Sequence, residues 1–420
     1  MVNKVNVIGT AKRKRLMLLG GIRYLKPVID AAHALGAHVI TADYLPDNIA
    51  HKYSDEYVNV SIIDRDAVLK AAQEREIDGI MSFACDPGVA TAAYVAERMG
   101  LPFQCSYESA RILQDKGLFR DFLSRHGFDC PRARRYTDAD AALADAGSFT
   151  WPVIVKPVDS AGSKGVTKVE APEGLRAAAE VARAGSHSGA FVVEEFIVFE
   201  GHHSSTDPFT VDGRLTAVSY SDQLFDREAA NPYTPAFIIW PTTMAQAHQD
   251  RLTGEVQRLM GLLGCRTGIY NVETCVGAGG VPYIMEVSPR GGGCKIAEIQ
   301  EMAFGANLIE NEVRKALGLP LTEIRTRPVD GHWCEMVIHA RPGQQGVFRR
   351  LEIREDVRRR NVRAVDLSVR EGDEVLPFTG ANRTLGDMFL RFDSREELDA
   401  CIADTGKWLD VVVDGGGRGA

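Results

Sequence analysis

The first hundred residues alternate short apolar runs with stretches in which apolar and polar residues recur at helical spacing. The runs that we expect to be strands are residues 16–21, 37–44 and 77–84, and the stretches that we expect to be helices are residues 26–36 and 64–76. Strands that alternate with helices in this way form a parallel sheet covered by helices. We therefore predict a doubly wound α/β domain over residues 1–108.

The turn after the first of these strands bears on whether the domain binds a dinucleotide. It reads Gly20-Gly21-Ile22-Arg23. This turn lacks the GxGxxG spacing that lets a backbone approach a pyrophosphate. We therefore expect a substrate-side or scaffolding domain rather than an NAD site.

The pattern changes beyond this domain. A helical stretch at 107–127 is followed by strand, Gly/Ser loop, strand, helix and strand up to residue 201, then by strands of antiparallel character, a helix at 248–264, a hairpin at 268–290 and a helix at 295–318. The final part contains expected strands at 333–340, 362–369 and 388–392 and an expected helix at 395–409. This mixed α+β order predicts a central domain at 109–322, with a subdomain at 149–201, and a small α+β unit at 323–420.

A glycine-rich loop lies in the segment VKPVDSAGSKGVTKV, Val155–Val169. It is not a Walker loop, because a strand-like stretch and not a helix follows it. A glycine-rich hairpin can still fold over a triphosphate through its backbone N–H groups, with Lys156 adding a positive charge. A flexible surface turn accounts for the same residues equally well, so the loop by itself leaves both interpretations open.

The hairpin at 268–290 contains two glutamates. If its turn centres between Ala278 and Gly279, Glu273 opposes Ile284 and Glu286 opposes Asn271. The residues that alternation then places on one face are Asn271, Glu273, Glu286 and Ser288. Two neighbouring carboxylates repel each other and favour a hard cation such as Mg²⁺ between them. The alternative is a pair of acids that faces solvent.

The composition is that of a soluble globular protein, with 45% hydrophobic and 25% charged residues. The net charge of −8 argues against general binding of nucleic acid, which relies on clustered Lys and Arg. The one dense basic run, residues 349–363, is interrupted by acids and is better interpreted as a solvated face than as a polyanion site.

Two further classes of protein are disfavoured. No apolar run approaches the ~20 residues that span a bilayer, and the N-terminus lacks the apolar region of a signal peptide, so we expect a cytoplasmic protein without membrane contact. The eight cysteines form no CxxC pair, which indicates reduced core residues rather than a zinc site or a disulfide framework.

Five motifs, taken in order, resemble those of ATP-grasp enzymes. They are Lys116 in QDKGLFRDFL, Lys156 with the loop DSAGSKG, the segment EEFI, the acidic hairpin, and EVSPRGGG. Each motif alone is weak, but five in this order at compatible spacing are specific, and the match covers most of the chain. The resemblance implies an ATP-grasp fold, with ATP and Mg²⁺, or Mn²⁺ in its place, as cofactors.

The resemblance also implies roles for individual residues. The positions that match nucleotide contacts are Lys116, Lys156, Ser160, Gly162, Ser163, Gly165, Glu194, Glu195, Ile197 and His203, with Glu200 as the alternative to His203 at the ribose. The positions that match metal ligands are Glu273, Glu286 and, where many members have Asn, Ser288. Arg290 matches the arginine that faces the transferred phosphate, and with Lys156 it is the expected catalytic residue.

Two branches of the family resemble different parts of the chain. Residues 19–55 are similar to formate-dependent glycinamide ribonucleotide transformylase, and residues 369–404 are similar to amino-acid ligases that form dipeptides. The leading expectation is an ATP-dependent carboxylate–amine ligase that joins a small-molecule carboxylate and an amine through an acyl phosphate. The alternatives are a formate- or bicarbonate-activating enzyme acting on a nucleotide precursor, and a nucleotide-binding regulator without catalysis.

The sequence gives less information on the substrates and on the oligomeric state. Residues that can line the substrate pocket are His202, His203, Tyr233 and Gly291–Cys294, and each has a packing or turn role as the alternative. Two segments are candidate lids, the DSAGSKG loop and residues 226–237. A homodimer is expected by analogy with the fold alone.

Overall fold

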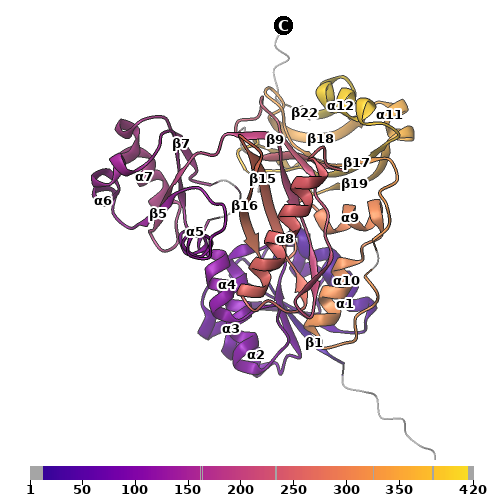
Figure 1. Cartoon of the computed structure of the whole chain (residues 1–420). Helices are drawn as coiled ribbons and strands as arrows, with labels where there is room; N and C mark the ends of the chain where they lie inside the picture. The colour runs from indigo at the N-terminus through magenta and orange to yellow at the C-terminus, as the bar shows by residue number, and fades with distance from the viewer. Residues whose placement is uncertain are drawn as a thin grey trace, which may run out of the picture.

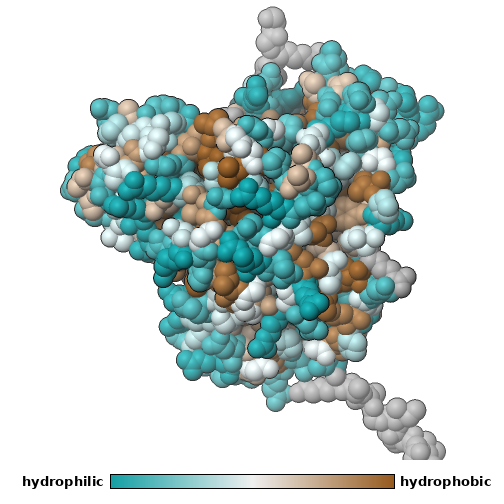
Figure 2. Space-filling view, in the orientation of Figure 1, coloured by the Kyte–Doolittle hydropathy of each residue, from teal (hydrophilic) through white to brown (hydrophobic). Residues whose placement is uncertain are grey.

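The computed structural model describes residues 13–160, 162, 164–231, 234–324, 326–380 and 383–414. Figure 1 shows an α/β domain formed by the first part of the chain, a small lobe that projects to one side, and a large body that carries the C-terminal elements. Figure 2 shows the same lobe standing apart from the body, with hydrophilic residues over most of this face and small groups of hydrophobic residues among them.

The N-terminal domain is built on a four-stranded parallel sheet with the strand order β3-β2-β1-β4. Its strands are β1 (Arg15–Leu19), β2 (His38–Asp43), β3 (Glu56–Asn59) and β4 (Gly79–Ser82), and its helices are α1 (Lys26–Ala34), α2 (Arg65–Glu74) and α3 (Val89–Met99), with short 3₁₀ turns η1 (Arg23–Leu25), η2 (Ile49–Lys52) and η3 (Asp86–Gly88). The predicted parallel α/β arrangement is confirmed. Strand β3 was not predicted, because this short edge strand has only one fully buried residue, Val58.

The helical stretch predicted at 107–127 is two helices, α4 (Tyr107–Gln114) and α5 (Lys116–Arg125). They meet at Asp115, whose carboxylate accepts hydrogen bonds from the N–H groups of Gly117 and Leu118. This side-chain cap starts a new helix at Lys116. The lysine therefore lies in the first turn of α5, next to the lobe that follows.

The projecting lobe, which we call the lid, has an antiparallel sheet with the order β5-β8-β6-β7. Its strands are β5 (Ala133–Tyr136), β6 (Val153–Pro157), β7 (Thr167–Val169) and β8 (Phe191–Glu195); the helices are α6 (Ala139–Ala144) and α7 (Leu175–Ala184), with turns η4 (Ala146–Ser148) and η5 (Pro172–Gly174). Val153 and Val155 pack with α7 residues in the lid core. Since side chains alternate along a strand, Lys156 projects from the opposite face of β6.

The body is built on an eight-stranded sheet with the order β16-β15-β9-β12-β13-β17-β21-β19. Its strands are β9 (Phe199–Thr206), β12 (Asp222–Phe225), β13 (Pro235–Trp240), β15 (Asn271–Gly277), β16 (Val281–Ser288), β17 (His332–Ile338), β19 (Val362–Leu367) and β21 (Gly386–Phe392). The sheet therefore joins the acidic hairpin to strands from the last hundred residues. Helix α8 (Gln246–Leu262) packs against it, as Figure 1 shows.

Two small sheets complete the architecture. One contains β10 (Phe209–Val211), β11 (Arg214–Ala217) and β14 (Gly268–Ile269), and the other contains β18 (Gly346–Ile353), β20 (Glu374–Val375) and β22 (Leu409–Asp414), with α11 (Glu355–Arg360), α12 (Arg395–Ala403) and η6 (Thr405–Lys407) nearby. In the described part of the chain, no helix has both the length and the apolar character that crossing a membrane requires. All eight cysteines are free thiols.

The register predicted for the acidic hairpin is wrong in detail. Glu273 faces Glu286 and Asn271 faces Ser288 directly, and the shift arises from a β-bulge at Met285. The turn is also one residue longer, at residues 278–280, with left-handed backbone at both of its glycines. The predicted sharing of one face by these four residues is confirmed, because direct cross-strand partners point the same way.

The single helix predicted at 295–318 is two helices, α9 (Ile296–Phe304) and α10 (Leu308–Ala316). Gly305 ends the first in a left-handed conformation (φ 79°), and the Asn307 side chain caps the second. The break lets α10 turn toward the N-terminal domain.

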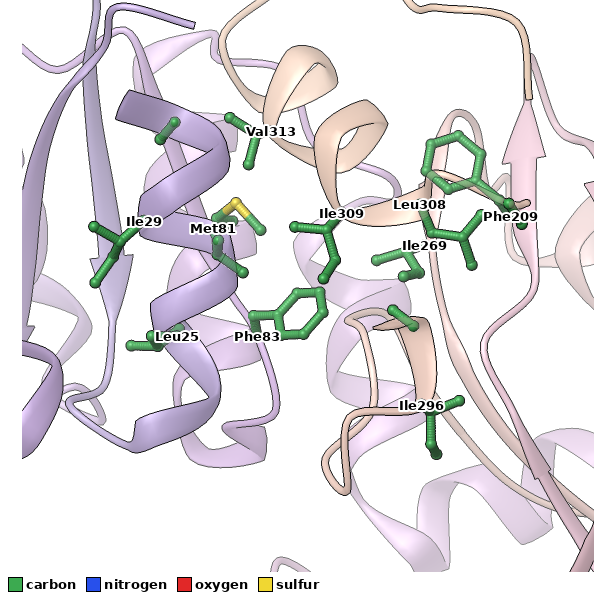
Figure 3. Packing of buried hydrophobic residues seen from close by; sticks show 14 of the residues in the cluster. Leu25, Ile29, Met81, Phe83, Phe209, Ile269, Ile296, Leu308, Ile309 and Val313 are labelled. Carbon is green, nitrogen blue, oxygen red and sulfur yellow. The ribbon is translucent and has the colours of Figure 1, made fainter. Parts of the chain in front are cut away.

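A continuous apolar core joins the N-terminal domain to the body. Figure 3 shows Met81 of β4, and Phe83 just after it, beside Ile309 and Val313 of α10 across this junction. The fit is close at Gly79, where an added Cβ would lie 2.3 Å from the carbonyl oxygen of Ala316. The domain and the body are therefore packed as parts of one interior.

Candidate active site

Lys116 lies where α5, the lid loop and the acidic hairpin meet. Its Nζ donates to the carbonyl oxygen of Ser160 at 3.0 Å and lies 3.4 Å from the Glu286 carboxylate. Burial lowers the pKa of Lys116, but the negative charges of Glu286 and Asp86 outweigh this and raise it. The lysine is therefore a fixed positive charge between the lid loop and the hairpin.

Glu273 and Glu286 are direct cross-strand partners on β15 and β16. Burial and the charge of Glu286 raise the pKa of Glu273 to about 7. The charges of Lys116 and Arg290 act in the opposite direction without compensating fully. The pair therefore keeps an uncompensated negative charge, which a bound cation would neutralise.

Lys156 belongs to a buried ion-pair network in the lid. Its Nζ lies 3.0 Å from the Glu194 carboxylate, which Arg120 of α5 also contacts through Nε at 2.6 Å. Burial raises the pKa of Glu194, but the charges of Arg120 and Lys156 prevail and bring it to about 2. Burial lowers the pKa of Lys156, and the nearby Arg120 and Lys116 contribute to this. Glu194 thus holds together two cations that would otherwise repel each other.

The glycine-rich loop connects β6 and β7 and is anchored at its start. The Ser160 hydroxyl donates to the carbonyl oxygen of Gly185 at 2.6 Å, so the loop begins against the end of α7. Gly162 and Gly165 have left-handed backbone, with φ of 68° and 70°. Ser163, also predicted to contact nucleotide, lies outside the described residues.

Glu195 and Ile197, predicted to contact adenine, lie at and just after the end of β8. The N–H of Glu195 donates to the carbonyl of Arg132 at 2.9 Å, and its carboxylate accepts from the N–H of Thr150 at 2.7 Å, so Glu195 is fixed in the lid. Within the described residues, no hydrogen bond uses the N–H of Ile197. A contact between that N–H and a base edge stays a prediction.

His203 and Glu200 were the two predicted candidates for a ribose contact. His203 lies two residues before Ser205, the β9 partner of Glu273, so it shares the face of the sheet that carries the metal-ligand candidates. Burial and His202 lower its pKa to about 4, so it is a neutral ring. The Glu200 carboxylate instead accepts from the N–H of Gly279 in the hairpin turn. The geometry favours His203 as the residue nearer the site.

Arg290 is held by a residue of the N-terminal domain. Its guanidinium donates from Nε and Nη2 to the two carboxylate oxygens of Asp86, at 2.9 and 2.7 Å. Burial raises the pKa of Asp86, but the positive charge of Arg290 prevails and lowers it. This two-point contact fixes the plane and direction of the guanidinium.

Ser288, the third predicted metal ligand, is bonded within the protein. Its hydroxyl donates to Asp86 at 2.8 Å and accepts from the Gln114 side chain at 2.7 Å. Ser288 therefore connects α4, the hairpin and the N-terminal domain. Whether it also contacts metal stays a prediction.

Gly292 lies where the neighbouring side chains leave no room for a Cβ atom. The Gly292 N–H donates to Asp207 at 2.7 Å, and Asp207 also accepts from the Asn271 amide at 2.9 Å. An added Cβ at position 292 would lie 2.8 Å from Asp207 and 2.9 Å from Asn271. Burial raises the pKa of Asp207 to about 7. Asp207 thus holds the backbone that follows Arg290.

The residues predicted to line the substrate pocket are only partly brought together. Gly291–Cys294 follows Arg290 directly and lies beside the N-terminal domain, because Ala84 N–H donates to the carbonyl of Gly291. His202 points to the opposite face of β9 from His203. Tyr233 lies outside the described residues. The second candidate lid begins at Asp226, which is held 2.9 Å from the Nε2 of His339.

Sequence reasoning missed three residues of this region. Asp86 follows the carboxyl end of a parallel strand, which is where such sheets bind ligands, and this placement was a usable signal. Arg120 is one helical turn after Lys116, a spacing that puts both on one face of α5. Asp207 had no signal in the sequence, since its role depends on contacts with distant segments.

The acidic hairpin fits a magnesium ion in its donor chemistry. Glu273 and Glu286 supply hard carboxylate oxygens and an unbalanced negative charge. Within the described residues, no group of three or more His, Cys, Asp or Glu side chains is suited to hold a metal. Mg²⁺ commonly binds one or two protein carboxylates, with substrate phosphates and water completing its shell.

Family models match two parts of the chain. The ATP-grasp domain model matches residues 113–294, and the ATP-grasp N-terminal domain model matches residues 29–103. Together they cover more than half of the chain. The first match contains every residue from Lys116 to Arg290 described above.

Individual proteins are similar over most of the chain. The formate-dependent phosphoribosylglycinamide formyltransferase of Synechococcus sp. strain WH7803 is 26% identical over 316 residues, which are 74% of this chain and 78% of that protein. The L-amino acid ligase from Bacillus licheniformis superposes with a TM-score of 0.77 at 21% identity, over 96% of this chain and 100% of that one.

A second solved structure leads to the same fold. Phosphoribosylglycinamide synthetase from Anaerococcus prevotii gives a TM-score of 0.73 at 18% identity, over 96% of this chain and 100% of that chain. At such low identity these likenesses establish the shared fold, and the predicted ATP-grasp architecture is confirmed. The chain therefore belongs to the ATP-grasp family, as an ATP-dependent enzyme of the ligase type.

Proposed function

We propose that the protein is a carboxylate–amine ligase, which joins a small carboxylic acid to a small amine in an amide or peptide-like bond. The reaction consumes ATP, passes through an acyl phosphate and releases ADP and phosphate. Similarity of the fold to the L-amino acid ligase from Bacillus licheniformis supports this substrate class. The observation that carries the proposal is the direct pairing of Glu273 with Glu286 beside the partly buried Lys116.

The positive groups of the site suit phosphoryl transfer. Lys116 and Lys156 would contact the phosphates of ATP, and the loop from Ser160 to Gly165 would cover them with its backbone N–H groups. When bound at Glu273 and Glu286, Mg²⁺ neutralises charge on the phosphates. Positioning and charge neutralisation are the main requirements of this chemistry, and a nucleophilic side chain is not needed.

The first chemical step follows from this arrangement. A carboxylate oxygen of the acid attacks the γ-phosphorus, the bond to the bridging oxygen breaks, and ADP leaves with the electron pair. Arg290, held in one orientation by Asp86, would stabilise the charge shared between the phosphate and the carboxylate. Closure of the lid would protect the acyl phosphate from water.

The second candidate is formate or bicarbonate activation on a nucleotide precursor. It is supported by the similarity to the Synechococcus formyltransferase over 74% of the chain. Such a substrate carries a phosphate that needs a free cationic site. The partly buried Arg23, in the turn after β1, is already paired with Asp387 through two hydrogen bonds, which disfavours this alternative.

The test is a screen for ADP release. Standard amino acids and small carboxylic acids are offered in pairs with ATP and Mg²⁺, and formate and bicarbonate are included as single acids with a purine precursor. Amide formation that requires one acid and one amine supports the proposal. ADP release that requires formate or bicarbonate, and no carboxylate–amine pair, would favour the second candidate instead.

A further inference from the structure

A second group of buried charged residues lies where strands β17 and β21 face the N-terminal domain. Glu335 on β17 is a diagonal neighbour of Asp387 on β21, on the same face of the sheet. Glu335 is completely buried, and neither of its carboxyl oxygens accepts a hydrogen bond from a donor in the described part of the chain. The adjacent Asp387 carboxyl can bond to it only if one of the two carries a proton.

The two cations near Glu335, Arg23 and Lys295, form ion pairs with other carboxylates. Arg23 donates to Asp387 at 2.6 and 3.1 Å and to the hydroxyl of Tyr24 at 2.8 Å. Lys295 contacts Asp366 at 2.8 Å and Glu298 at 3.3 Å. Four carboxyl groups thus face two cations, and Glu335 is the one without a positive partner among them.

This arrangement creates a site for a cation. A buried carboxylate that is neither paired nor hydrogen-bonded is costly, so the group must bind a proton or a positive ligand. Burial, and after it the charge of Asp387, raises the pKa of Glu335 well above its ordinary value. In the free protein Glu335 therefore carries a proton that a ligand cation can replace.

The position of Glu335 links it to the active site. Cys294, four residues after Arg290, lies against the same group, since the charges of Glu335 and Asp387 raise its pKa after burial does. Cys294 and Lys295 both have left-handed backbone, with φ of 49° and 51°, which costs energy in residues other than glycine. The approach is partly open, because the Arg23 side chain is 18% exposed and Tyr24 and Cys294 are partly exposed.

We infer that Glu335, supported by Asp387, is the subsite for the protonated amino group of the amine substrate and accepts a proton from it. This inference rests on the proposed ligase function and names the site of its second substrate. A primary ammonium supplies the missing positive charge and three N–H donors to oxygens that have none. It would enter along Gly291–Cys294, beside the acyl phosphate at Arg290.

The proton balance of the second step follows. Binding of R–NH₃⁺ displaces the Glu335 proton to solvent, and the ammonium then passes one proton to the Glu335 carboxylate. The free lone pair attacks the acyl carbon, the carbon–oxygen bond to phosphate breaks, and phosphate leaves with the electron pair. The second proton leaves the nitrogen as the amide forms and goes to phosphate, which departs as HPO₄²⁻.

A pH dependence of amine binding results. The charged or titratable groups around Glu335 are Asp387 on β21, Arg23 and Tyr24 at η1, Cys334 on β17, Cys294 and Lys295 before α9, and Glu298 on α9. Because Glu335 must lose its proton to bind an ammonium, the KM for the amine should fall as pH rises, as long as the amine stays protonated. The variant Glu335→Gln should lose this dependence.

Two nucleophiles distinguish the subsite from the first half of the reaction. Hydroxylamine is largely uncharged at pH 8 and traps acyl phosphates as hydroxamates without an ammonium subsite. With ATP, Mg²⁺ and the acid, Glu335→Gln should form hydroxamate at the wild-type rate. With the standard amino acids as amines, its KM should rise at least ~10-fold, the loss expected for one charge-assisted contact.

The controls separate the possible failures. Asp393→Asn removes a carboxylate that lies outside this group, is paired with Arg391 and is 83% exposed, and it should leave both reactions unchanged. Glu335→Leu repeats the test if the Gln variant does not fold. If the wild type forms no hydroxamate with any acid, the ligase function itself is wrong. If it does, and the Gln or Leu variant keeps the wild-type amine KM or changes only the Mg²⁺ dependence, the subsite assignment is wrong.

Discussion

Both oxygens of the Asp86 carboxylate accept hydrogen bonds from the Arg290 guanidinium, at 2.9 Å from Nε and 2.7 Å from Nη2. Asp86 comes from the turn after β4 in the N-terminal domain, whereas Arg290 follows the hairpin of the body. The orientation of the arginine that would face the transferred phosphate is therefore set by another domain. The N-terminal domain thus contributes to the site through Asp86, which also bonds to Ser288 of the hairpin.

We predict that Asp86→Asn lowers kcat by about 10- to 100-fold, the range expected when a charge-assisted hydrogen bond that orients a transition-state contact is lost. The amide retains the shape but offers only one oxygen acceptor. The KM for ATP should change little. Steady-state kinetics of ADP release measure both values, and Arg290→Ala, which removes the guanidinium, should abolish turnover. Wild-type kcat in Asp86→Asn would contradict the positioning role.

We predict that ADP formation depends strictly on the two paired glutamates of the hairpin. Glu286→Ala should reduce ADP formation by at least ~10³-fold, as expected for loss of an electrostatic contact to the reacting phosphates. The Mg²⁺ concentration required for the residual activity should rise. Glu173→Ala, at an exposed glutamate of the lid, is the matched control and should behave as wild type. Near-normal turnover in Glu286→Ala would refute the metal-ligand assignment.

The buried network of Glu194 predicts how stability changes with pH. Its pKa is about 2 in the folded protein against 4.5 in a model peptide. A lowered pKa stabilises the fold fully above about pH 4.5, and this stabilisation, on the order of 3 kcal/mol, is lost as the pH falls toward 2. Glu194→Gln should therefore be less stable than wild type at pH 7, and the difference should shrink below pH 4.5. Urea unfolding of both proteins at pH 7, 4.5 and 3 measures this difference in the free energy of unfolding. A difference that does not change with pH would contradict the ion pairs of Glu194.

A pair of glycine substitutions separates local fit from general stability. Gly292→Ala places a methyl group 2.8 Å from Asp207 and should displace the backbone that follows Arg290, lowering kcat with little effect on the KM for ATP. Gly254→Ala, at an exposed position in α8 with no neighbour within 4 Å, should leave kinetics unchanged. It should also raise stability by about 0.5–1 kcal/mol through helix propensity. Equal kinetics in the two variants would argue against the role of Asp207.

The prediction that Glu273 and Glu286 share one face held because the true pairing differs from the predicted one by two residues, which is a full period of side-chain alternation. The register itself was not predictable, since it depends on a bulge at Met285 and a three-residue turn, neither of which leaves a clear mark in the sequence. The sharing of one face was thus obtained from a wrong pairing.

The contacts of Arg290 and Glu335 show more clearly what could not be predicted from the sequence. Arg290 was identified by its motif, but its partner Asp86 is 204 residues away, and only the packing of the two domains brings them together. Glu335 looks like one more polar residue in a strand. Its lack of a partner becomes visible only when all of its neighbours are known.

The continuity of the eight-stranded sheet bears on how the chain can be divided. Strand β13 lies in the middle of the sheet with β17 on one side, and β17 belongs to the last hundred residues. A protein cut at residue 322 would expose the backbone of Ala236-Phe237-Ile238-Ile239 as an open edge, the kind of surface that recruits other chains into aggregates. Expression of the nucleotide-binding part alone should therefore yield insoluble material.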